Sequence, residues 1–108
     1  MSEKSAGSVI LDQPQVRMIA NEFAIHKGIT LLCGRDETDH LTPFMDELRH
    51  TGASQEFRES VMSESIEMLN KIGVEEPEYI CTPEMFEGAE TRVTQAHQQW
   101  DEMRGISE

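Results

Sequence analysis

Basic residues are scarce in this chain of 108 residues. Nine Lys and Arg stand against 21 Asp and Glu, so the formal net charge at pH 7 is -12. The basic residues are scattered singly, and no basic stripe offers a surface for phosphates, which the acidic residues would repel. This imbalance argues against direct binding to nucleic acid and favours a partner protein with a basic surface.

Long hydrophobic runs and abundant cysteines are also missing. No apolar stretch is long enough to span a membrane, and the N-terminus lacks the basic start and apolar core of a signal peptide. Cysteine is limited to Cys33 and Cys81, too few for a disulfide framework. We therefore expect a cytoplasmic protein without membrane contact, in which both cysteines are reduced thiols, with one disulfide as the alternative.

Apolar residues are few for a globular domain, at 37% of the chain, and aromatic residues make up 6%. Low hydrophobicity combined with high net charge is a signature of disorder. The apolar residues nevertheless recur at helical spacing, so we expect disorder only at the ends, in a flexible N-terminal arm (residues 1–11) and a tail (residues 106–108). Residues 12–105 are predicted to form a single helical domain.

Start and stop signals divide this domain into four predicted helices. The capping residues that start them are Asp12, Thr42, Ser54 and Thr82, and the glycines that end them are Gly34, Gly52, Gly73 and Gly105. The predicted helices span residues 14–33, 43–50, 55–72 and 83–104, and the predicted fold is an all-α small bundle. Residues 29–33 form an apolar run compatible with helix or strand, for which we predict helix.

The third predicted helix carries an apolar stripe that we expect to face the core. Its members are Phe57, Val61, Ile66, Leu69 and Ile72. Residues 75–81, which Pro77 interrupts, are predicted to be a loop before the last helix.

The last predicted helix has the most regular periodicity. Its apolar residues are spaced by three and four positions and comprise Phe86, Ala89, Val93, Ala96, Trp100 and Met103. This seam is too short for a free-standing coiled coil, so we expect it to pack inside the bundle, with a homodimer through the last helix as the alternative. Trp100 is also a candidate partner anchor, because Trp is enriched at interface hot spots.

No catalytic or cofactor motif stands out. The chain has no Gly-rich phosphate loop, no nucleophile elbow and no Walker-type Lys. Its His and Cys residues fit no zinc spacing, and one Glu-x-x-His pair, Glu47 with His50, is too little for a di-iron site. We therefore expect no enzyme, no cofactor and no metal. A helical metal- or redox-active protein that uses His and Cys is an alternative.

Clusters of acidic residues carry the functional signal. The candidate partner-binding acids are Asp36, Glu37 and Asp39 in one turn, Glu75, Glu76 and Glu78 in another, and Glu84 and Glu87 at the start of the last helix. A solvated face that keeps the protein soluble accounts for part of this charge. Self-repulsion makes the remainder costly, which favours a function for it.

These clusters indicate a non-enzymatic protein-binding module. We expect a small acidic inhibitor or antiactivator that masks the basic or dimerisation surface of a nucleic-acid-binding partner, such as a transcription regulator or a nuclease complex. A structural or chaperone-like adaptor that docks through the last helix is a further alternative.

Overall fold

The computed structural model describes residues 14–35 and 39–104. In these parts of the chain it contains five helices and no strand, which confirms the predicted all-α bundle. The helices are α1 (Pro14–Leu32), α2 (Leu41–Leu48), α3 (Gln55–Gly73), α4 (Pro77–Ile80) and α5 (Pro83–Met103). The expected arm and tail, and the signals at Asp12 and Gly105, lie outside the described residues.

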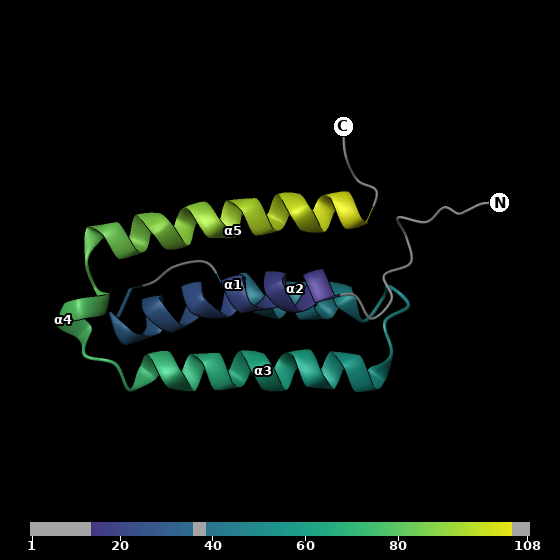
Figure 1. Ribbon diagram of the computed structural model, residues 1–108, viewed down its shortest axis with the longest axis horizontal. Coiled ribbons are helices and arrows are strands. Elements are labelled where there is room, and N and C mark those ends of the chain that lie inside the picture. The colour runs from purple at the N-terminus through teal and green to yellow at the C-terminus, as the bar shows by residue number, and fades with distance from the viewer. Residues whose placement is uncertain (1–13, 36–38, 105–108) are drawn as a thin grey trace.

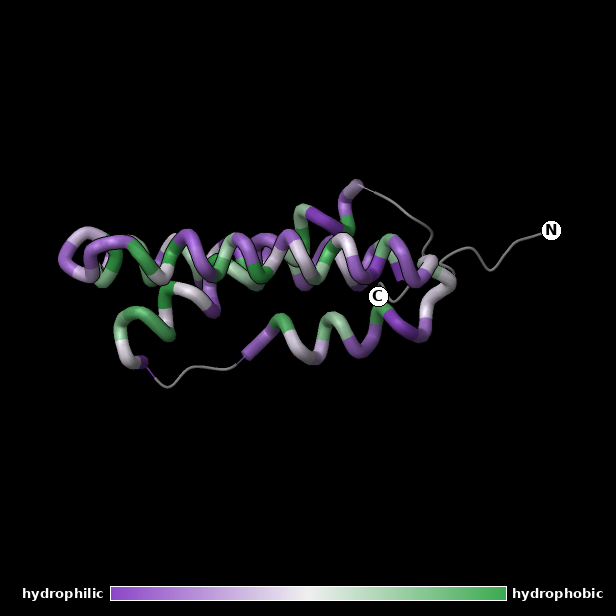
Figure 2. The backbone as a smooth tube through the Cα atoms, turned by 90° about the horizontal axis from the view of Figure 1, so that it is seen from below, coloured by the Kyte–Doolittle hydropathy of each residue, from purple (hydrophilic) through white to green (hydrophobic). Residues whose placement is uncertain are grey.

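Helix α1 is the centre of the bundle. Helices α3 and α5 run along its two sides (Figure 1), and α2 lies on one face of the layer that these three helices form (Figure 2). Because α1 has neighbours on several sides, its buried residues do not keep to one narrow stripe. They include Val16, Ile19, Ala20, Phe23, Ala24 and Ile29.

Capping explains where three of the helices begin. The side chain of Ser54 accepts a hydrogen bond from the Phe57 amide of α3, and that of Thr82 accepts one from the Met85 amide of α5. Helix α2 begins at Leu41, two residues before the predicted start. The reason is Asp39, whose Oδ1 accepts hydrogen bonds from the Leu41 and Thr42 amides at 2.9 and 3.3 Å.

Helix α1 continues as a helix through residues 29–32, as predicted, and Gly28 lies inside it. At that point α3 comes very close, because a Cβ atom on Gly28 would lie 3.0 Å from Cδ1 of Ile72. Glycine here permits a close approach of the two helices.

Two details of the prediction are wrong. Ile66 is 48% exposed, and Ser65 takes the buried position instead, so the buried line of α3 runs through Phe57, Val61 and Ser65 at four-residue spacing. The predicted loop of residues 75–81 contains the short helix α4.

The expectation of two free thiols is also wrong. Cys33, which follows α1, and Cys81, which lies between α4 and α5, form a disulfide with their Cα atoms 5.6 Å apart. The bond ties the end of the central helix to the turn from which α5 departs.

Candidate functional site

The structure brings two of the predicted acidic clusters to one end of the bundle. Helix α4 lies where the chain turns back from α3 to α5 (Figure 1), so the loop acids and those of the first turns of α5 share that end. We call this set the acidic end; its members are Glu75, Glu76, Glu78, Glu84 and Glu87. All five side chains are exposed.

None of these five carboxylates makes a hydrogen bond or ion pair with another described residue. Glu84 lies in the first turn of α5, where the helix dipole favours a negative charge. Glu78 likewise lies in the first turn of the short helix α4. Within residues 14–35 and 39–104, no Lys, Arg or His side chain neutralises these five carboxylates.

Exposed apolar side chains lie among these acids. Val74 is 83% exposed and Tyr79 is 71% exposed, and both flank the glutamates of the loop and of α4. Leu31, in the last turn of α1, is 67% exposed. Large apolar residues surrounded by polar ones are typical of protein-binding surfaces. Sequence reasoning did not single out Tyr79 as an exposed aromatic residue; its place in a Glu-rich segment broken by Pro77 was the available signal.

Asp39 does not belong to this surface. Besides capping α2, its carboxylate accepts hydrogen bonds from Lys27 Nζ at 2.9 Å and from Thr42 Oγ1 at 2.7 Å. Burial alone would raise the pKa of Asp39, but the hydrogen bonds from Lys27, Thr42 and Leu41 outweigh burial and lower the pKa from 3.8 to about 2. Asp39 is thus occupied inside the molecule, and Asp36 and Glu37 lie outside the described residues.

Trp100 is a core residue and not a surface anchor. Its side chain is only 2% exposed, and its ring meets Phe44 of α2 edge-on with 4.8 Å between the ring centroids. The indole Nε1 donates a hydrogen bond of 2.7 Å to Glu47, whose Oε1 also accepts one from Arg104. The seam of α5 therefore packs inside the bundle, as predicted, where α1 occupies it.

Three histidines that are remote in sequence meet between α1, α2 and α5. Nδ1 of His40 and Nε2 of His97 are 3.0 Å apart and share a hydrogen bond. The ring centroids of His26 and His40 are 5.1 Å apart, and those of His40 and His97 are 5.0 Å apart. We call these three residues the histidine cluster. They are separated by 14 and 57 residues in the sequence, and these spacings do not predict that the three residues meet.

The cluster lies in a partly buried environment. His26 is 2% exposed, and its Nε2 donates to Glu90 at 2.9 Å, while its buried Nδ1 has no partner among the described residues. Burial lowers the pKa of His40, and the neighbouring His97 and His26 lower it further. No group of three or more His, Cys, Asp or Glu in residues 14–35 and 39–104 is arranged to hold a metal ion.

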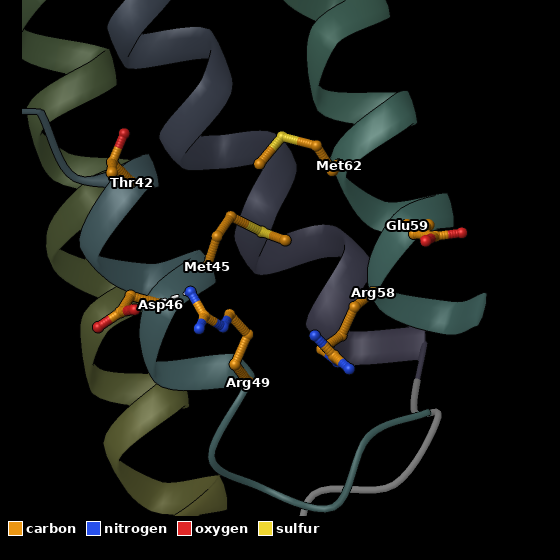
Figure 3. A pocket seen from close by; sticks show the side chains of 7 residues that line it. All are labelled: Thr42, Met45, Asp46, Arg49, Arg58, Glu59 and Met62. Carbon is orange, nitrogen blue, oxygen red and sulfur yellow. Dashed lines mark hydrogen bonds and ion pairs between the residues drawn. The ribbon is translucent and has the colours of Figure 1, made fainter. Parts of the chain in front are cut away.

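Two hollows lie beside α2. The first, of about 320 Å³, separates α2 from α3, and Met45 and Met62 extend into it from opposite helices (Figure 3). Its rim carries Arg49, which is paired with Asp46, together with Arg58 and Glu59. The opposite charges on this rim balance, so the hollow has no clear preference for an ion of either sign.

The second hollow, of about 310 Å³, lies between α2 and α5. His40, His97 and Asp101 line it together with buried aromatic rings, among them Phe44 and Trp100. The histidine cluster therefore forms part of the junction between α2 and α5.

No protein-family model, curated protein or solved structure matches this chain. None of the helices within the described ranges is long and apolar enough to cross a membrane.

Proposed function

We propose that this chain is a non-enzymatic protein-binding module whose acidic end docks on a basic surface of a partner protein. The observation that carries the proposal is the set of five exposed carboxylates, unpaired within the described chain, around the exposed side chains of Val74 and Tyr79. Tyrosine is a favoured anchor at interfaces, and charges around an anchor steer the encounter and set the register.

The finer proposal is that the partner binds nucleic acid and that this chain is its inhibitor or antiactivator. A surface that attracts phosphates carries the Lys and Arg side chains that the carboxylates of the acidic end would meet. By occupying that surface, the chain would compete with nucleic acid without binding nucleic acid itself.

Two other expectations have less support. The seam of α5 is buried against α1, so a homodimer or an adaptor that docks through this seam would first have to displace α1. The cytoplasmic location stays a prediction, and the Cys33–Cys81 disulfide weighs against it, because disulfides are rare in cytosolic proteins.

A charge-reversal pull-down tests the proposal. The test variant is Glu75→Lys, Glu76→Lys and Glu78→Lys. The matched control, Glu67→Lys, Asp101→Lys and Glu102→Lys, changes the net charge equally at exposed positions away from the acidic end. Wild type and control should retain the same protein from a host extract, and the test variant should lose it. Retention by the test variant would show that the acidic end is not the docking surface.

A competition assay tests the finer proposal. The purified partner is loaded with a fluorescent oligonucleotide, and this chain is titrated in. Displacement by wild type, and none by the charge-reversed variant, is the expected result. A partner that binds the chain and the oligonucleotide together would contradict the inhibitor proposal while leaving the docking surface intact.

A further inference from the structure

We propose that the histidine cluster is a pH-sensitive clamp that holds α2 against α5 at neutral pH and releases it when both His40 and His97 carry an additional proton. The proposal is independent of the acidic end, and its test needs no partner.

The contact that holds the clamp closed is the hydrogen bond between His40 Nδ1 and His97 Nε2, which are 3.0 Å apart. One nitrogen must carry a proton and the other must accept it. A first additional proton leaves this bond in place, because an imidazolium can still donate to a neutral imidazole. A second additional proton on this pair places two N–H groups against each other, and the hydrogen bond cannot persist.

Protonation of several rings would also crowd positive charges in the histidine cluster. The ring of His40 lies about 5 Å from both other rings, with centroid distances of 5.1 Å to His26 and 5.0 Å to His97. His26 is 2% exposed and cannot turn into solvent without the helix moving. Multiple protonation therefore creates like charges at short range in a partly desolvated place, which separation of the elements relieves.

The other charged groups around the cluster leave little negative charge to balance protons on both His40 and His97. From α1 and the turn before α2, Lys27 and Asp39 neutralise each other at 2.9 Å. From α2, Glu47 is engaged by Arg104 and Trp100.

From α5, Glu90 faces His26 at 2.9 Å and favours a proton there, and Asp101 lies on the rim of the hollow beside His97. Glu90 is 57% exposed, so solvent screens its charge. The lowered pKa of His40 agrees with a cluster that resists further protonation.

Helix α2 is the element that would move. It has 8 residues, whereas α1, α3 and α5 have 19, 19 and 21. His40 is its N-cap residue, so loss of the bond to His97 frees the beginning of α2 directly. The hollow of about 310 Å³ between α2 and α5 would open onto the rings of Phe44 and Trp100.

Amide hydrogen exchange across pH tests the clamp. Protection of α2 amides, corrected for intrinsic exchange, should fall on the order of tenfold relative to α3 as the pH is lowered from about 8 through about 5, the ordinary range of His, and below it, because the pKa of His40 is lowered. The variants are His97→Gln and His40→Asn, whose side-chain amides do not titrate and can either donate through nitrogen or accept through oxygen at the places of Nε2 and Nδ1. Both should keep α2 protection nearly constant with pH. His50→Gln is the matched control outside the cluster and should behave like wild type.

Loss of α2 protection in His97→Gln and His40→Asn equal to that of wild type, or no loss in wild type, would overturn the proposal. Imidazole nitrogen shifts of the wild type give a second reading that does not depend on the variants folding. The α2 amide shifts should follow the imidazole shifts of His40 as the pH falls. Full protonation of His40 with the α2 amide shifts unchanged would also overturn it.

Discussion

Trp100 connects α5 to α2 through both its ring and its indole nitrogen. Truncation of a fully buried aromatic residue leaves a cavity, so Trp100→Ala should lower the free energy of unfolding by roughly 3–5 kcal/mol. Trp100→Phe keeps an aromatic ring against Phe44 and loses the hydrogen bond, so it should lose less. Urea denaturation of both variants checks this, and a loss below about 1 kcal/mol in Trp100→Ala would show that the ring is not in the core.

The close approach of α1 and α3 at Gly28 leads to a second prediction for a single residue. Alanine favours a helix over glycine by about 1 kcal/mol. Here, however, its Cβ would lie 3.0–3.2 Å from three atoms of Ile72. Gly28→Ala should therefore destabilise the protein by about 1 kcal/mol or more, as overpacking does.

In the double variant Gly28→Ala with Ile72→Ala, two of the three close atoms are gone and Cβ of residue 72 remains at 3.1 Å, so alanine at position 28 should then destabilise the protein less. A double-mutant cycle by denaturation measures this coupling. Additive effects of the two substitutions would contradict the close approach of α1 and α3.

At the scale of the elements, local sequence predicted the helices well because their ends are locally encoded. The side chains of Ser54 and Thr82 bond amides three residues away, and such caps can be read from the chain. The start of α2 was missed because Thr42-Pro43 also looks like a helix start, whereas Asp39 is the residue that accepts the first amides.

The candidate site could be predicted only in part. The acidic residues are visible in the sequence, but their gathering at one end depends on how α4 returns the chain to α5. The spacing of Trp100 favours a core residue, but an interface anchor stays open until its neighbours are known. The histidine cluster depends wholly on tertiary packing, because His26, His40 and His97 come from three separate segments.

The Cys33–Cys81 disulfide, which joins elements at the acidic end, should stabilise the fold. It joins residues 48 positions apart, and closing a loop of that size in the unfolded chain corresponds to roughly 4 kcal/mol in the chain-entropy model. Cys33→Ser with Cys81→Ser should therefore lower the free energy of unfolding by roughly 2–4 kcal/mol. The wild type should lose the same amount under reducing conditions, and the variant should not respond to reductant.

Thiol titration of the unreduced, denatured protein is the control for this experiment. It should find no free thiol. Two free thiols per chain, or equal stability with and without reductant, would contradict the role of the disulfide.

At the scale of the whole molecule, stability should fall on the acid side of neutrality in two ranges. The pKa of His40 is lowered by folding, so below pH 6.5 the unfolded chain binds more protons than the folded one, and the free energy of unfolding decreases. The pKa of Asp39 is lowered to about 2, so its stabilising contribution is present above pH 3.8 and is lost as the pH falls towards 2.

Urea denaturation at a series of pH values checks both ranges. Replacing His40 with Asn should flatten the upper one, and replacing Asp39 with Asn should flatten the lower one. An increase in wild-type stability from pH 7 to pH 5 would contradict the assignment for His40.

The net charge of -12 should make binding at the acidic end strongly dependent on salt. The most direct measurement is surface-plasmon kinetics of the captured partner over a salt series from about 0.1 to 1 M, in which the Debye length falls from about 10 to 3 Å. The association rate should fall steeply with salt, and Glu75→Lys with Glu76→Lys and Glu78→Lys should slow association more than it speeds dissociation. An association rate that is flat in salt, together with normal binding by this variant, would show that the acids serve solubility alone.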